Sequence, residues 1–171
     1  MTDLWVFGYG SLIWRPAFPF VEQVPAHIDG WKRRFWQGSV DHRGRPGSPG
    51  RVVTLLPAPG QSVCGMAFRV EPASSDTVLE QLDVREVGGY DRSEQTLFCE
   101  DGRQVDGLVY VATASNDNFL GPAPIELIAH TAMHSVGPSG TNREYVLRLA
   151  DALKQMGCED SHVTQLADLL R

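Results

Sequence analysis

The order of hydrophobic patterns along the chain is the feature that most limits its fold. Short β-prone runs occupy most of the first 111 residues, with one helical pattern among them, whereas the segments after residue 124 follow helical spacing. Strands gathered early and helices gathered late are typical of an α+β protein. We therefore expect a curled sheet with helices packed against it.

The expected strands are runs of β-prone residues that end at turns or glycines. They are residues 4–7, one or two strands within 24–40, and then 51–56, 65–70, 94–99 and 104–111. The last two flank the sequence E-D-G-R, and Asp-Gly between β-prone runs predicts a hairpin. Residues 41–50 hold three glycines and two prolines, so we expect a loop there.

A first helix is expected at residues 75–85, because Val78 and Leu82 recur at helical spacing and a Gly-Gly pair follows. Three more are expected near the C-terminus, at residues 124–135, 141–156 and 161–170. Thr141 and Glu144 have the spacing of a capping box, in which each side chain satisfies a backbone N–H at the start of a helix.

The size of the chain predicts one domain covering residues 1–171. With 171 residues and 42% apolar content, the chain can bury a core without disulfides. It begins with M-T-D rather than with basic residues and an apolar run, so no secretory signal is expected. Its apolar stretches are also far shorter than a membrane span. These features favour a cytoplasmic protein that contacts no membrane.

The cysteines are three in number, widely spaced, and form no C-x-x-C pair. Neither a disulfide framework nor a zinc ribbon is therefore predicted for Cys64, Cys99 and Cys158. None begins a helix among basic residues, so a cysteine nucleophile is not favoured either. We expect buried, unreactive thiols in a reducing compartment.

The sequence G-Y-G-S-L-I at residues 8–13 follows the first strand directly. It begins like a dinucleotide fingerprint, but Ile13 stands where the third glycine belongs, and Pro16 and Pro19 oppose the helix that would receive a pyrophosphate. A tight glycine turn still presents consecutive backbone N–H groups to an anion or a carbonyl oxygen. The turn is therefore either structural or a cradle for a ligand.

A metal site is one alternative that the histidines suggest. Glu126, His130 and His134 lie four residues apart and would share one helix face. The order differs from H-E-x-x-H, and no motif nearby completes a ligand shell. A helix face without a metal is the favoured interpretation.

A second alternative is binding of single-stranded nucleic acid. Aromatic and basic residues are mixed in W-K-R-R-F-W at residues 31–36, and Arg43, Arg45 and Arg51 follow. The whole chain is acidic, with a net charge of −6 and a pI near 5.3, which opposes phosphate binding. A strand with one packed face and extended arginine side chains explains the pattern better, so no nucleic-acid partner is expected.

A carboxylate stands at the expected end of the first helix, in D-V-R-E-V-G-G-Y at residues 83–90. The negative pole of the helix would raise the pKa of Glu86, particularly if Val87 and Tyr90 keep water away. Such a carboxylate is a better general base than an exposed one. A surface glutamate paired with Arg85 is the alternative.

Several segments together resemble the ChaC family of glutathione-specific gamma-glutamylcyclotransferases, over almost the whole chain. They are V-F-G-Y-G-S-L-I-W at 6–14, G-W-K-R-R-F at 30–35, D-H-R-G at 41–44, P-G-R-V-V-T-L at 49–55, R-E-V-G-G-Y at 85–90 and G-P-S-G-T-N-R-E-Y at 137–145. One departure is Cys64, at a position where relatives usually carry tryptophan before a glycine.

The resemblance implies a gamma-glutamylcyclotransferase-like α+β fold, in which a mixed, partly open β-barrel is flanked by helices. It implies an enzyme that converts glutathione into 5-oxoproline and cysteinylglycine, with Glu86 as the catalytic acid and base. The substrate-binding residues that it implies are Val6, Phe7, Gly8, Tyr9, Gly10, Ser11, Leu12 and Tyr145.

The implied reaction needs neither a metal nor another cofactor. The α-amine of the substrate attacks the γ-amide carbonyl of the same molecule and closes a five-membered ring, so the nucleophile is already tethered. Glu86 would take the ammonium proton and return it to the departing amine. Backbone N–H groups of residues 9–12 would hold the glutamyl carboxylate or the developing oxyanion.

Two alternatives to this function stay open. One is a cyclotransferase that acts on other gamma-glutamyl amino acids or amines, and the other is a non-catalytic module that binds gamma-glutamyl peptides. Glu86 favours an enzyme, because a binding module would be expected to lose the residue that transfers the proton. Glutathione is the partner that the resemblance indicates, and nothing in the sequence points to an obligate protein partner.

Overall fold

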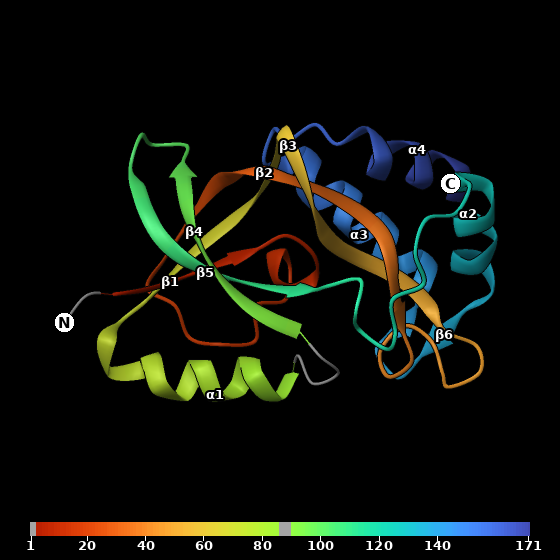
Figure 1. Cartoon of the computed structure of the whole chain (residues 1–171), viewed down its shortest axis with the longest axis horizontal. Helices are drawn as coiled ribbons and strands as arrows, with labels where there is room; N and C mark the ends of the chain where they lie inside the picture. The colour runs from red at the N-terminus through yellow and green to blue at the C-terminus, as the bar shows by residue number, and fades with distance from the viewer. Residues whose placement is uncertain (1–2, 86–89) are drawn as a thin grey trace.

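The computed structural model describes residues 3–85 and 90–171, which form a five-stranded β-barrel with four α-helices around it (Figure 1). The barrel strands are β1 Leu4–Gly8, β2 Glu22–Ser39, β3 Gly50–Val70, β4 Tyr90–Cys99 and β5 Gln104–Ala112. The helices are α1 Ser75–Arg85, α2 Ile125–His134, α3 Asn142–Gln155 and α4 Ser161–Leu170. Two short 3-10 helices, η1 Ser11–Ile13 and η2 Pro72–Ser74, and the short strands β6 Val136–Gly137 and β7 Gly140–Thr141 join them. The predicted α+β class is confirmed.

The barrel is mixed, with the strand order β1-β3-β2-β4-β5 around a closed ring. Its neighbouring strands are antiparallel except β1 and β5, which run parallel and meet at Val6 and Leu108. The pairing of β2 with β4 is also short, and includes His27 opposite Phe98. The ring is therefore closed by two short strand pairings, β1 with β5 and β2 with β4. The predicted mixed barrel flanked by helices is confirmed.

The strand β3 differs from the prediction, because one strand of 21 residues replaces the two expected at 51–56 and 65–70. Pro57 and Pro59 lie between the two expected strands. The strand continues because β2 pairs with it along most of its length. Pro57 lies opposite Trp31 at a register shift, where the ladder is already irregular and a proline is tolerated.

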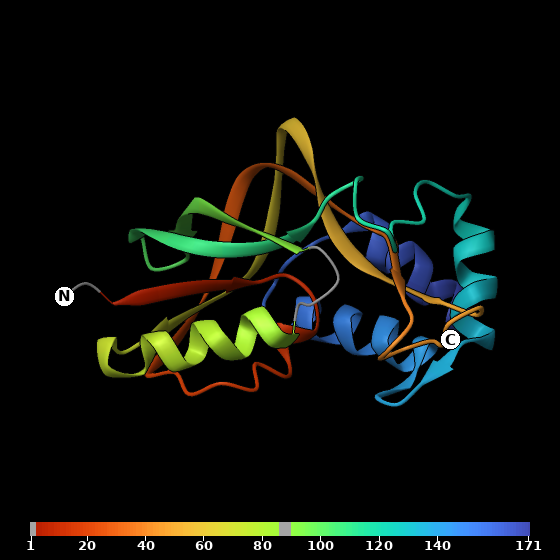
Figure 2. The same cartoon turned by 60° about the horizontal axis from the view of Figure 1, so that its bottom comes forward.

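The α-helices cover two sides of the barrel (Figures 1 and 2). Helix α1 packs through Val78 and Leu82 into a buried cluster that also holds Val6 and Phe68. Helices α2, α3 and α4 gather where the long β2 and β3 extend, and their apolar side chains share a larger cluster with the strands. Successive strand residues point to opposite faces, so Val6 faces α1 whereas Phe7 joins the larger cluster.

The C-terminal helices begin at capping residues. Thr141 Oγ1 accepts the backbone N–H of Glu144 at 3.1 Å, so one half of the predicted capping box is present. The Glu144 carboxylate binds two arginine side chains instead of closing the other half. Asp160 caps α4 in the same way, accepting from Val163 N at 3.2 Å. In the described part of the chain, no helix has the length and apolar character needed to cross a membrane.

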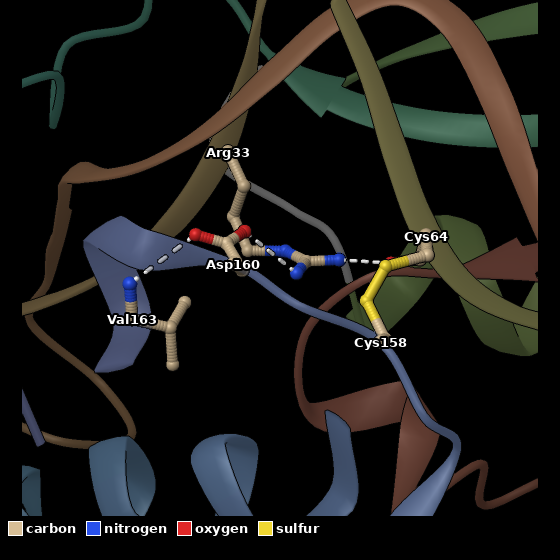
Figure 3. The surroundings of a disulfide bond; sticks show 5 residues. All are labelled: Arg33, Cys64, Cys158, Asp160 and Val163. Carbon is tan, nitrogen blue, oxygen red and sulfur yellow. Dashed lines mark hydrogen bonds and ion pairs between the residues drawn. A yellow bond between two sulfur atoms is a disulfide. The ribbon is translucent and has the colours of Figure 1, made fainter. Parts of the chain in front are cut away.

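The expectation of free thiols is wrong for two of the three cysteines. Cys64 of β3 and Cys158, in the connection between α3 and α4, form a disulfide (Figure 3). They are 94 residues apart, so their spacing carries no signal, and the packing of the β2–β3 hairpin against the C-terminal helices brings them together. Cys99 is buried and free, and burial raises the pKa of its thiol.

A buried ion pair lies beside this disulfide (Figure 3). The Arg33 side chain is 0% exposed; its Nη1 donates to Asp160 Oδ2 at 3.0 Å and its Nη2 donates to the backbone oxygen of Cys64. Burial lowers the pKa of Arg33, and the Asp160 charge opposes that shift. Because Asp160 also caps α4, the ion pair and the disulfide fasten the same helix end to the β2–β3 hairpin.

We expect reduction of the disulfide to lower the melting temperature by roughly 5–15 °C. Closing a loop near 100 residues stabilises a protein by up to about 4.7 kcal/mol, through the lost entropy of the unfolded chain. A thermal melt of the wild type with and without dithiothreitol measures the effect. Cys158→Ser should have a lowered melting temperature that dithiothreitol does not change further. The melting temperature of Cys99→Ser should still fall when dithiothreitol is added. A wild type whose melting point does not change on reduction would contradict the expectation.

Candidate active site

A cavity of about 420 Å³ opens beside the glycine turn that follows β1, which is a volume suited to a small molecule. Its wall comes from segments far apart in the sequence: the turn itself, the end of β2, the start of β3, the loop after β2, and Tyr145 of α3. Tyr90 and Tyr110 contribute from β4 and β5. The cavity therefore lies where the barrel meets the helices.

Six of the eight residues predicted to bind substrate line this cavity. They are Phe7, Tyr9, Gly10, Ser11, Leu12 and Tyr145. Val6 is not among the lining residues, because its side chain points to the opposite face of β1 and is fully buried against α1. Gly8 is not in the wall either; a Cβ there would lie 2.9 Å from Leu12 Cβ, so the glycine allows the turn to fold back closely.

The turn is a short 3-10 helix whose hydrogen bonds run from Ile13 N to Gly10 O at 3.0 Å and from Trp14 N to Ser11 O at 3.2 Å. It stops before Pro16, as predicted. Gly10 has a φ of −134°, so the turn does not need glycine for a left-handed backbone. A Cβ at Gly10 would instead lie 3.0 Å from Tyr145 Oη, and this close approach excludes a larger residue.

Tyr145 is held in the cavity wall by contacts on several sides. Its Oη accepts the backbone N–H of Val53 at 3.3 Å. The ring meets Trp14 and Phe35 edge to face, with centroids 5.4 Å and 6.1 Å away. The side chain is 5% exposed, so its hydroxyl is a fixed feature of the site.

The start of α3 is tied to β3 by a two-point contact. The fully buried Asn142 accepts the N–H of Arg51 through Oδ1 and donates to its backbone oxygen through Nδ2, both at 2.8 Å. The Arg51 guanidinium donates to the backbone oxygens of Phe35 and Gly121 at 3.0 and 2.9 Å. This contact sets the position of α3, and hence of Tyr145, relative to the barrel.

Arg43 joins the loop after β2 to the same helix, and sequence reasoning did not identify it as a site residue. Its Nη1 donates to Thr141 O at 3.0 Å and to Glu144 Oε2 at 3.1 Å. The guanidinium lowers the pKa of Glu144, with a smaller contribution from Arg148. Arg43 Cζ lies 5.7 Å from the centre of the Tyr145 ring.

Two tyrosine side chains link the cavity wall to α1. Tyr9 Oη donates to the backbone oxygen of Tyr110 at 2.5 Å, and Tyr110 Oη donates to Asp83 Oδ1 at 2.9 Å. Burial and the bond to Asp83 both raise the pKa of Tyr110, so this phenol stays protonated at neutral pH. The last turn of α1 is thereby fixed against the side of the barrel that carries the cavity.

Glu86, the predicted acid and base, lies outside the described residues. Before it, α1 ends at Arg85, and after it β4 begins at Tyr90, which lines the cavity.

The other candidates from the sequence gain no support from their placement. Within residues 3–85 and 90–171, no three His, Cys, Asp or Glu side chains gather as a metal site would require, those on the α2 face included. In the basic segment at 31–36, Arg33 is buried in an ion pair and Lys32 stacks on Trp36 with Nζ 5.2 Å from the ring centre. These contacts within the protein account for Arg33 and Lys32 and add no support for a nucleic-acid site.

Comparisons with known proteins agree on one family. A family model described as ChaC-like protein matches residues 4–171. The chain is 46% identical to gamma-glutamylcyclotransferase 2-3 of Arabidopsis thaliana, over 98% of this chain and 88% of the relative. It is 43% identical to human glutathione-specific gamma-glutamylcyclotransferase 1, over 96% of this chain and 77% of the relative.

A solved structure agrees with the fold and with the family. The crystal structure of the yeast gamma-glutamyl cyclotransferase specific to glutathione superposes with a TM-score of 0.90 at 32% identity, covering 99% of this chain and 96% of the yeast chain. Sequence and structure therefore lead to the same conclusion, and the chain belongs to the ChaC family.

Proposed function

We propose that this protein is a glutathione-specific gamma-glutamylcyclotransferase, which cleaves glutathione into 5-oxoproline and cysteinylglycine. The observation that carries the proposal is the gathering of the turn at residues 9–12 and the distant Tyr145 in one cavity of about 420 Å³. The names of the Arabidopsis and human relatives, at 46% and 43% identity, support the choice of reaction, and the name of the human relative also supports the choice of substrate.

The chemistry requires one bond to form and one to break within the same molecule. The α-amine nitrogen of the glutamyl group attacks the γ-carbonyl carbon, and the C–N bond to cysteine then breaks. Tethering replaces a bimolecular encounter, and well-oriented internal reactions of this kind reach effective molarities of roughly 10⁵–10⁸ M. The protein has to hold the glutamyl group in the folded conformation that brings its two ends together.

A proton must leave the amine before the attack and must reach the departing nitrogen after it. The α-ammonium of a peptide has a pKa of about 8, so most of it is protonated at neutral pH. We assign the transfer to Glu86, which takes this proton as a base and returns it to the cysteinyl nitrogen as an acid. The ring nitrogen loses a second proton as the lactam forms, and the released cysteinyl amine gains one to become an ammonium. Protons then balance over the catalytic cycle without a metal or another cofactor.

The turn is proposed to hold the glutamyl end of the substrate. Backbone N–H groups of residues 9–12 are suited to the glutamyl carboxylate or to the oxyanion that develops on the γ-carbonyl. Gly10 brings its backbone close to Tyr145 and Val53, each 3.0 Å from the position of a Cβ. A ligand at the turn would therefore lie against main chain and a fixed tyrosine hydroxyl.

We expect Gly10→Ala to reduce kcat/KM for glutathione by at least about tenfold while the protein stays folded. The methyl group must displace either Tyr145 Oη or Val53 Cγ2, and small misplacements in a site reduce turnover strongly. Thermal melting and steady-state kinetics on the same variant separate the effects on stability and activity. A lowered melting point with unchanged kinetic constants would show that the turn is scaffold only.

The proposed function is tested by incubating the purified protein alone with glutathione, gamma-glutamylcysteine and gamma-glutamylalanine, and measuring 5-oxoproline. A chelator is included and no nucleotide is added. Preferential release of 5-oxoproline from glutathione supports the proposal. Equal release from all three substrates would favour a general gamma-glutamyl cyclotransferase, and binding without release would favour a non-catalytic module.

A further inference from the structure

Arg43 is a buried cation in the wall of the cavity. The residue is 4% exposed overall and lines the cavity close to Tyr145. Its position is fixed at two places: the backbone N–H donates to Ser39 Oγ at 2.8 Å, and Nη1 donates to Thr141 O and Glu144 Oε2. A guanidinium held in this way loses little freedom when it binds an anion.

The charge of Arg43 is only partly neutralised. Glu144 divides its carboxylate between two arginines, since Oε2 accepts from Arg43 at 3.1 Å and Oε1 accepts from Arg148 at 2.9 Å. The Glu144 side chain is 41% exposed whereas that of Arg43 is 5% exposed, so water screens the carboxylate more than the guanidinium. One carboxylate facing two guanidiniums cannot neutralise both, so part of the charge of Arg43 remains. Asp41 also lines the cavity, but its side chain is 62% exposed and lies 4.0 Å from His42 Nε2.

Two of the five N–H groups of this guanidinium donate within the described residues, and the other three do not. Nη1 carries both of its side-chain hydrogen bonds, and neither Nε nor Nη2 donates to any residue within 3–85 or 90–171. A carboxylate can accept two parallel hydrogen bonds from the Nε and Nη2 edge of an arginine. The geometry of the side chain therefore fits one carboxylate of a ligand in the cavity.

Tyr145 separates this cation from the glycine turn. Its Oη is at the turn, 3.0 Å from the position of a Cβ on Gly10, while Arg43 Cζ lies 5.7 Å from the ring centre. The cavity thus has a backbone end and a cationic end. An extended tripeptide spans roughly 10 Å and carries its last carboxylate at the end away from its first residue. With the glutamyl group at the turn, the glycyl carboxylate is the anion that can reach Arg43.

We propose that Arg43 binds the glycyl carboxylate of glutathione and so makes the enzyme select this tripeptide over gamma-glutamyl compounds without a carboxylate at that distance. The inference rests on the proposed function and adds the residue that determines specificity at the cysteinylglycine side. Arg43 is a binding residue in this role and takes no part in proton transfer.

Arg15 is the other arginine in the cavity wall, and its exposure argues against the same role. Water around an exposed guanidinium weakens its attraction for a carboxylate, whereas a buried guanidinium keeps it. Arg15 therefore offers a matched control: the same residue type, in the same wall, with a different degree of burial.

The test compares glutathione with its glycyl monoethyl ester, which differs only in the blocked carboxylate. We expect the wild type to have a kcat/KM roughly 10–100-fold higher for glutathione, the range of a charge-assisted hydrogen-bonded contact. Arg43→Met should lower kcat/KM for glutathione by this factor, mainly through KM, and bring the ratio of the two substrates close to one. Arg15→Met should keep the wild-type ratio.

Four other results would contradict the proposal, and each has a different explanation. A wild type that prefers neither substrate excludes glycyl carboxylate recognition, even if no Arg43 variant folds. If Arg43→Met lowers kcat/KM equally for glutathione and for its ester, Arg43 contacts the glutamyl end instead. If only Arg15→Met abolishes the preference for glutathione over the ester, Arg15 makes the contact with the glycyl carboxylate. Absence of 5-oxoproline from both substrates with the wild type would overturn the proposed function as well.

Discussion

Replacing Glu86 by glutamine is expected to lower kcat for glutathione by roughly 10²–10⁴-fold, the usual loss when a general acid and base is removed. Glutamine keeps the size and polarity of the side chain but cannot accept the ammonium proton. Substrate binding should change much less than turnover, because the turn and Tyr145 stay intact. The loss should therefore fall in kcat, with KM near that of the wild type.

A matched control comes from the preceding helix. Glu80 is an exposed carboxylate of α1, so Glu80→Gln makes the same chemical change without touching the proposed site. Glu80→Gln should keep full activity, and both variants should melt within a few degrees of the wild type. If Glu86→Gln retains turnover within about threefold of wild type, Glu86 has no part in proton transfer.

A large loss of stability is expected from Arg33→Met. Removing one partner of a buried ion pair costs roughly 3–5 kcal/mol, because the other charge loses its compensation. Here Asp160, whose side chain is 15% exposed, would lose its partner, and the backbone oxygen of Cys64 would lose a donor. For a chain of this size we expect the melting temperature to fall by roughly 10 °C.

Two further variants separate the ion pair from general damage to the strand. Arg33→Met combined with Asp160→Asn should be more stable than Arg33→Met alone, since no uncompensated charge remains and asparagine still caps α4. Lys32→Met removes a partly exposed cation from the same strand and should change the melting temperature little. An Arg33→Met protein as stable as Lys32→Met would contradict the structural role of the pair.

Local patterns were sufficient to predict much of the fold. Helices α1, α3 and α4 lie where apolar spacing and caps such as Thr141 predict them. The turn after β1 lies where its glycines and prolines predict it. These features depend on residues a few positions apart, which is the range over which propensity and capping act. The continuous β3 was not predicted, because its pairing with β2 outweighs the local effect of Pro57.

The contacts that build the site join residues too far apart for spacing to indicate them. The disulfide links Cys64 to Cys158 across 94 residues, and Arg43 reaches Glu144 across 101. Resemblance to the family identified Tyr145 and the turn as parts of one site. It also covered the D-H-R-G segment at 41–44, but gave no role to Arg43. Only the packing of α3 against β3 shows that Arg43 and Tyr145 share a cavity wall.

The most direct test of internal attack is cleavage of glutathione by the purified protein in water enriched in ¹⁸O. If the amine is the nucleophile, no water enters the product, and unlabelled 5-oxoproline should appear in equal amounts with cysteinylglycine. If water is the nucleophile, the product is glutamate carrying one ¹⁸O in its γ-carboxylate. Mass spectrometry of the two products distinguishes these results: unlabelled 5-oxoproline is the outcome we predict, and labelled glutamate would contradict it.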